Sequence, residues 1–119
     1  MLHTILLGSP PASNLSYEIV APLDRDGCLD ARRWQENPEA CTVRRQRPGE
    51  AARTGRLRFD RDRTGHALWF IRFDDGASDE PCYRIGAARI RRGDPVAVRD
   101  PVSAAMQTFE VRAVRRAPG

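Results

Sequence analysis

Hydrophobic and polar residues alternate along this chain in short runs separated by turn-forming Gly, Pro, Asp and Asn. The most apolar run extends from His66 to Phe73 and is too short for an ordinary helix. Alternation divides its side chains between two faces, with Ala67, Trp69, Ile71 and Phe73 on one and His66, Leu68, Phe70 and Arg72 on the other. Because both sets are largely apolar, the run predicts a central strand that is partly covered on both sides.

Weaker runs of the same kind predict further strands on either side of this one. They are Met1 to Leu7, Leu15 to Val20, Cys41 to Arg45, Gly55 to Asp60, Cys82 to Ile90, Pro95 to Arg99 and Gln107 to Arg115. The apolar member of each alternating pair, such as Leu57, Val96 or Phe109, is expected to face inward.

One short helix is predicted between Asp30 and Asn37. Asp30 can accept hydrogen bonds from the first helical N–H groups, and Pro38 ends the helix after about two turns. Since a helix of this length is unstable alone, we expect Leu29 and Trp34 to dock it on the sheet.

The rhythm of strands and turns from Gly55 to Arg116 is typical of a small antiparallel barrel. In its five strands, and in the Gly-Asp-x-Val-x-Val step from Gly93 to Val98, this segment resembles the SH3-like small barrels. We therefore predict a mainly β fold, α+β at most: an SH3-like antiparallel barrel or curled sheet with one short helix packed on it. Residues 1–119 would form a single domain, with 55–116 as its barrel-like core. Residues 1–54 would add the helix and a strand, Leu15 to Val20, that pairs at an otherwise exposed barrel edge.

Composition places the chain among soluble globular proteins, since 40% of its 119 residues are hydrophobic and 30% are charged. No run approaches membrane-spanning length, and the apolar run Ile5 to Leu7 lacks the basic flank of a signal peptide. We expect a cytoplasmic protein with no membrane partner. Cys28, Cys41 and Cys82 should be reduced thiols, because their odd number and spacing fit neither a disulfide framework nor a zinc site.

All 20 basic residues are arginine, and the net charge is +4. Arginine suits bidentate contacts to phosphate or carboxylate, but a codon bias would produce the same global pattern, and the sequence leaves both explanations open. The charge is uneven, with a net −1 over residues 1–50 and a net +5 over residues 51–119.

Arginines on the outward positions of the predicted strands form a candidate site for nucleic acid or another anion. They are Arg56, Arg58, Arg72, Arg84, Arg99 and Arg112. Beside aromatic residues such as Phe70 and Tyr83, these arginines could contact phosphates while the rings stack on bases. The 16 acidic residues are interspersed among them, however, so a solvated or protein-contacting face has the same pattern.

We expect no catalytic residue, no metal and no cofactor. Asp60 to Gly65 begins like a calcium loop, but Ile71 occupies the position of the closing glutamate, so a hairpin turn is predicted instead. His3, His66 and the cysteines lack metal-ligand spacing. Cys82 and His66 could act as nucleophile and base only if neighbouring strands brought them together.

These patterns favour a small non-enzymatic binding module that contacts a protein or peptide, with a homodimer through an uncovered strand edge as one mode of association. The alternative is a nucleic-acid-binding barrel that uses the arginine-rich face. An enzyme working at Cys82 and His66 is the third and least supported class.

Overall fold

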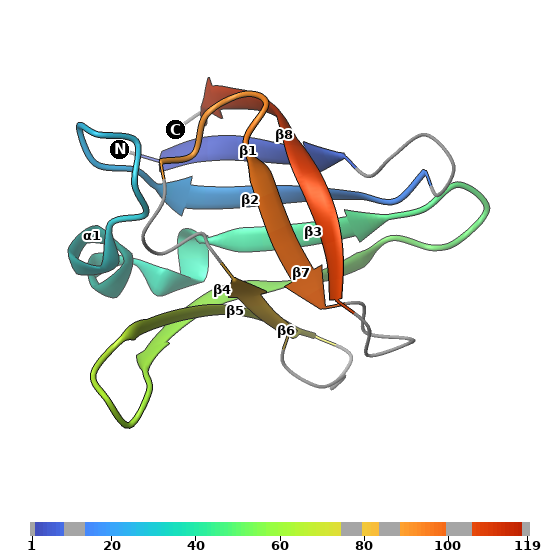
Figure 1. Cartoon of the computed structure of the whole chain (residues 1–119). Helices are drawn as coiled ribbons and strands as arrows, with labels where there is room; N and C mark the ends of the chain where they lie inside the picture. Colours follow the sequence, from blue (N-terminus) through green and yellow to red (C-terminus); the bar gives the residue numbers. More distant parts are fainter. Residues whose placement is uncertain (1, 9–13, 75–79, 84–88, 100–105, 118–119) are drawn as a thin grey trace.

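Eight β-strands and two short helices make up the part of the chain that the computed structural model describes, namely residues 2–8, 14–74, 80–83, 89–99 and 106–117 (Figure 1). The strands are β1 (Leu2–Gly8), β2 (Ser16–Pro22), β3 (Thr42–Gln46), β4 (Arg53–Arg61), β5 (Ala67–Phe73), β6 (Glu80–Tyr83), β7 (Pro95–Arg99) and β8 (Met106–Arg116). The helices are α1 (Ala31–Glu36) and the 3-10 helix η1 (Pro38–Ala40).

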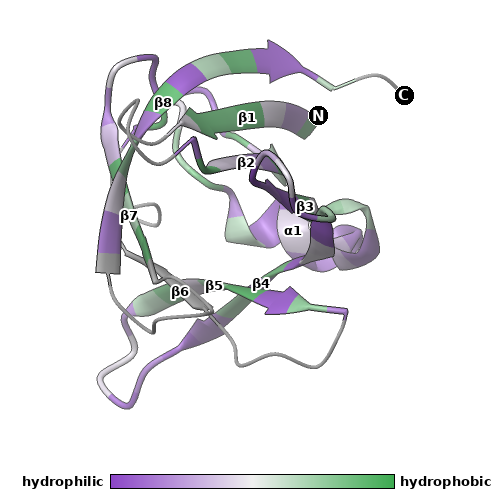
Figure 2. Cartoon of the chain, turned by 90° about the vertical axis from the view of Figure 1, so that its right-hand side faces the viewer, coloured by the Kyte–Doolittle hydropathy of each residue, from purple (hydrophilic) through white to green (hydrophobic). Residues whose placement is uncertain are grey.

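The strands form a closed antiparallel ring in sequence order. Each strand pairs with the next, and the hydrogen bonds between β8 and β1 close the barrel. Figure 2 shows the strands arranged around this ring, with the start of β1 and the end of β8 on the same side. The predicted mainly β fold, an antiparallel barrel with one short helix packed on it, is confirmed.

Strands from both halves of the sequence belong to the same ring. The five strands expected between residues 55 and 116 are β4 to β8, while β1, β2 and β3 occupy the other three positions. The strand predicted at an exposed barrel edge is β2, which pairs with β1 on one side and β3 on the other. Ring closure therefore gives every one of the eight named strands a partner on both sides, and the edge considered for a homodimer is paired.

The short helix forms where the sequence predicted it. The Asp30 carboxylate accepts a hydrogen bond from the Arg33 N–H, and the helix ends at Asn37 before Pro38. Leu29 is buried and Trp34 packs on the core. The Trp34 indole Nε1 donates to the Leu57 carbonyl oxygen at 2.8 Å, which fixes α1 against β4 at one end of the barrel, on the left in Figure 1.

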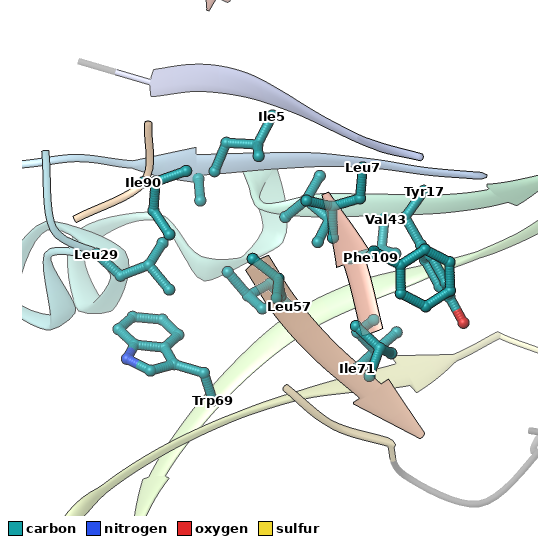
Figure 3. Close-up of a cluster of buried hydrophobic side chains, with 14 of the residues drawn as sticks. Ile5, Leu7, Tyr17, Leu29, Val43, Leu57, Trp69, Ile71, Ile90 and Phe109 are labelled. Atoms are coloured by element: carbon teal, nitrogen blue, oxygen red, sulfur yellow. The ribbon is translucent and has the colours of Figure 1, made fainter. Parts of the chain in front are cut away.

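The barrel interior is filled by the inward residues of every strand whose side chains are described. Figure 3 shows part of this core, with Tyr17 and Phe109 in edge-to-face contact on one side and Leu29, Trp69 and Ile90 on the other. In the centre, Leu57 and Ile71 are fully buried. Full burial of such a side chain stabilises the fold by about 1.5–3 kcal/mol, so the alternating pattern is the main source of stability.

The segment after β5 differs most from the sequence prediction. Of the strand predicted from Cys82 to Ile90, Cys82 and Tyr83 belong to β6 (Glu80–Tyr83), and residues 84–88 lie outside the described part of the chain. Ile90 is buried without belonging to a strand, and its N–H bonds to the Gly27 carbonyl oxygen at 2.7 Å. The backbone of Ile90 therefore pairs with a turn of the N-terminal half instead of extending a β-ladder.

Candidate functional site

The centre of the barrel leaves no room for a small-molecule ligand. The cavity lined by Ile5, Leu29, Leu57, Ile90 and other core residues measures about 10 Å³ and has no polar lining. A space of that size accommodates at most one water, and an apolar lining offers water no hydrogen-bond partner. Among the described residues, this part of the core therefore offers no space for a small-molecule ligand.

The predicted arginines Arg56, Arg58 and Arg72 lie together on the outside of the hairpin formed by β4 and β5. Cross-strand pairing sets Arg56 opposite Arg72, Arg58 opposite Phe70, and Asp60 opposite Leu68. We name this surface the outer β4–β5 face and define it by those six residues. Leu68 and Phe70 remain partly exposed on it, although the other side of the same strand buries Trp69, Ile71 and Phe73.

Acidic side chains neutralise much of the positive charge on the outer β4–β5 face. Glu39 of η1 lies 3.5 Å from Arg56 Nε and 3.7 Å from Arg58 Nη1, and Asp74 lies 3.9 Å from Arg56 Nη1. Like charges directly opposite on a sheet repel each other, so these carboxylates also reduce the repulsion between Arg56 and Arg72. The outcome is a mixed-charge surface around two apolar side chains.

An aromatic cluster supports this face from beneath. The Phe59 and Trp69 rings are 4.8 Å apart, and Trp34 meets Trp69 edge-to-face at 6.2 Å. The Arg58 guanidinium lies 6.0 Å from the Trp34 ring, and that of Arg61 lies 5.4 Å from the Phe59 ring. Such contacts hold arginine side chains in place at the end of the hairpin.

Among the other predicted arginines, only Arg112 has a described side chain. Arg112 lies on β8, which borders β1, away from the outer β4–β5 face (Figure 1). Arg84 lies outside the described residues, and Arg99 is described only through the backbone of β7. The predicted basic face is therefore not one continuous surface in the described part of the barrel.

Sequence reasoning missed one arginine that lies inside the barrel. Arg45 of β3 has a side chain only 3% exposed, 3.9 Å from Glu50, and its backbone is paired with Tyr17 of β2 and Arg53 of β4. Arg45 lies two residues after the buried Val43, so the alternation along β3 was the signal that could have indicated an inward side chain. Its burial was not predicted, because charged side chains are rarely buried.

The histidine and cysteine residues do not assemble a catalytic site among the described side chains. His66 is 80% exposed at the tip of the β4–β5 hairpin, where its backbone N–H donates to the Asp62 carboxylate. This confirms the hairpin turn predicted in place of a calcium loop. Cys82 lies in β6 opposite Val98 of β7, so strand pairing does not set it opposite His66.

Two thiols are described, and both lack the features of an activated nucleophile. Burial raises the pKa of Cys41 to about 11. The pKa of Cys28 is also raised, by desolvation first and then by the charges of Asp24 and Asp26. Among the described residues, no three His, Cys, Asp or Glu side chains are placed to bind a metal, and no helix is long and apolar enough to cross a membrane.

Comparison of the chain with protein-family models, with curated proteins and with solved structures finds no match. A functional proposal therefore depends on the charged and partly exposed apolar side chains of the outer β4–β5 face.

Proposed function

We propose that this chain is a non-enzymatic binding module that contacts a protein or peptide through the outer β4–β5 face. The observation that carries the proposal is the placement of partly exposed Leu68 and Phe70 among arginines whose charge Glu39 and Asp74 balance. Protein interfaces are enriched in aromatic residues and arginine at their centres and have polar rims.

The barrel supplies a rigid base for such contacts. Seven cross-strand pairs join β4 to β5, and the aromatic cluster of Trp34, Phe59 and Trp69 packs below them. A surface that is already ordered loses little conformational freedom on binding. The likeness of β4 to β8 to SH3-like barrels is part of this proposal, because SH3 domains bind extended peptides along aromatic-lined grooves.

Nucleic-acid binding is the second candidate, favoured by the arginines that lie near Trp34 and Phe59. Single-strand binders combine arginine contacts to phosphate with bases stacked on aromatic rings. Glu39 and Asp74 weigh against it, since they would repel a phosphate chain from Arg56 and Arg58. For that reason we place it second to protein contact.

Site-specific crosslinking tests the first candidate. A photoreactive amino acid at position 70 should give a defined protein adduct in cells, while the same group at exposed Arg115 of β8 should not. Leu68→Asp should abolish the adduct at position 70 without unfolding the barrel, because this side chain faces outward. Equal adducts from both positions, or none from position 70, would remove the outer β4–β5 face as the binding surface.

Fluorescence anisotropy with mixed-sequence single-stranded RNA and DNA separates the two candidates. Protein binding predicts weak association that changes little in the triple variant Arg56→Gln, Arg58→Gln, Arg72→Gln. Tight association that falls steeply with salt and is lost in that variant would instead establish the nucleic-acid function.

A further inference from the structure

A β-bulge interrupts the pairing that closes the barrel. Leu6 of β1 is opposite Ala113 of β8, but the next residue, Leu7, is opposite Val111. Arg112 is therefore an extra residue on β8 with no counterpart on β1. Bulges of this kind bend a strand and redirect a side chain, and they are frequent next to functional sites.

The bulge is not required by the core. Val111 pairs with Leu7 and Val114 pairs with Ile5, and both partners face inward. In a regular strand one outward residue separates two inward residues, but here two residues, Arg112 and Ala113, separate the two valines. Without Arg112, the sequence Val111, Ala113, Val114 would alternate regularly and keep both valines inward. The extra residue thus serves the outer surface.

Gly8 leaves the space that the Arg112 side chain occupies. A Cβ atom at position 8 would lie 2.5 Å from Arg112 Nε and 2.9 Å from its Cγ, so any other residue would displace the side chain. The backbone of Gly8 does not have the positive φ that favours glycine. Its missing side chain therefore matters for the space that it leaves to Arg112.

Two surface grooves meet at this arginine, and both are lined by Gly8 and Arg112. One, of about 560 Å³, continues to Thr108 and Glu110, and the other, of about 260 Å³, continues to Arg44 and Gln46. Arg112 lies 3.9 Å from Glu110, a distance too long for a hydrogen bond. Exposed ion pairs of this kind are weak, so an incoming anion can compete with the Glu110 carboxylate for the guanidinium.

We propose that the grooves around Arg112 form a second binding site, for a ligand that carries an oxyanion, either carboxylate or phosphate. A planar guanidinium binds such groups through two parallel hydrogen bonds. The neighbouring groove contains a second guanidinium, that of Arg44, together with its cross-strand neighbour Glu18. Hydroxyl and amide groups of Thr108 and Gln46 can bond to the rest of a polar ligand. This site lies on the β1 and β8 side of the barrel and does not depend on the outer β4–β5 face.

NMR titration of the whole folded chain with inorganic phosphate, and separately with glutarate, tests the proposal. We expect saturable shifts at the Arg112 Nε and at the Gly8 and Glu110 amides with at least one of the two probes, and the stronger probe identifies the ligand class. Gly8→Ala keeps every charge but displaces Arg112, so it should weaken binding by at least about ten-fold, as Arg112→Gln should. Arg115→Gln, an exposed change on the same strand outside the grooves, should leave binding unchanged.

Deletion of Arg112 is the complementary test, because it removes the bulge and the side chain together. The deleted chain should fold with its β-ladder regular and should no longer bind the probe. Saturable binding that persists in Gly8→Ala or in the deleted chain, or the absence of shifts around Arg112 with both probes, would overturn the proposal.

Discussion

Close approach of two strands at Gly55 is a strict single-residue requirement of this barrel. A Cβ atom there would collide with the backbone of Arg72 and Phe73 on β5, which cannot move without breaking the ladder. Gly55→Ala should lower the free energy of unfolding by about 1–3 kcal/mol, the usual range for overpacking. Urea denaturation measures this loss.

Gly8→Ala is the matched control for that steric argument. The three atoms nearest to the new methyl group all belong to the flexible Arg112 side chain, so we expect a loss of less than about 1 kcal/mol. Similar losses in the two variants would show that strand proximity at Gly55 is not the cause.

The two described thiols should differ in their reactivity. Cys41 is fully buried and its pKa is raised to about 11, so it holds little thiolate at neutral pH and is shielded from reagents. Cys28 is partly exposed. Iodoacetamide should modify Cys28 first and Cys41 only after unfolding, as peptide mass spectrometry can show. Equal labelling rates in the native chain would contradict the burial of Cys41.

Individual residues show where sequence reasoning reached its limit. Alternation correctly predicted the inward Leu57, Val96 and Phe109, because those side chains gain free energy by leaving water. Arg45 follows the same alternation, but its burial was not predicted, because a charged side chain is costly to bury. The ion pairs of Arg56 and Arg58 with Glu39 could not be predicted either, since they depend on how η1 packs against β4.

Among the secondary-structure elements, local signals succeeded where the chain itself determines the conformation. The cap at Asp30 and the stop at Pro38 both act within a few residues, and α1 begins and ends accordingly. The bulge at Arg112 depends on pairing with β1, which is distant in sequence. The sequence indicates the bulge only through the spacing of apolar residues. Phe109 and Val111 are two residues apart, whereas Val111 and Val114 are three apart.

Protonation of His3 is expected to weaken the pairing of β1 with β8. Burial lowers the pKa of His3 below its ordinary value of 6.5, and the positive charge of Arg116 on β8 contributes to the shift. The unfolded chain therefore binds this proton at a higher pH than the folded chain. The contribution of His3 to the free energy of unfolding should fall as the pH drops below about 6.5 and stay level above it.

Urea denaturation of wild type and His3→Gln between about pH 5 and pH 8 measures this effect. The His3→Gln chain should lose less stability than wild type as the pH falls through this range. Parallel curves for wild type and His3→Gln would show that His3 does not contribute.

At the scale of the whole molecule, periodicity predicted the fold class but not the ring order. A barrel closes only when the last strand finds the first, and that contact joins residues separated by nearly the whole sequence. The candidate site divides for the same reason. Arg56, Arg58 and Arg72 meet because β4 and β5 form a hairpin, whereas Arg112 faces a different side because β8 returns to β1.

Closure through distant strands implies that the C-terminal segment should not fold by itself. Residues 51–119 contain β4 to β8 but lack the core side chains that β1, β2 and β3 contribute. Those side chains are Ile5, Leu7, Tyr17, Ile19, Ala21 and Val43. Without them, β4 and β8 each lose the neighbour on one side and present unpaired edges, which promote aggregation. We expect the isolated fragment to lack cooperative thermal unfolding by circular dichroism.

A second fragment distinguishes loss of core side chains from mere shortening of the chain. The break after residue 50 falls in an exposed loop that contains Pro48 and Gly49, where cleavage removes no strand. Residues 1–50 mixed with residues 51–119 should therefore reassemble the ring and restore cooperative unfolding, because strand pairing and not the loop holds the halves together. If residues 51–119 unfold cooperatively alone and gain nothing from residues 1–50, the C-terminal strands form an autonomous barrel and the first three strands are an addition to it.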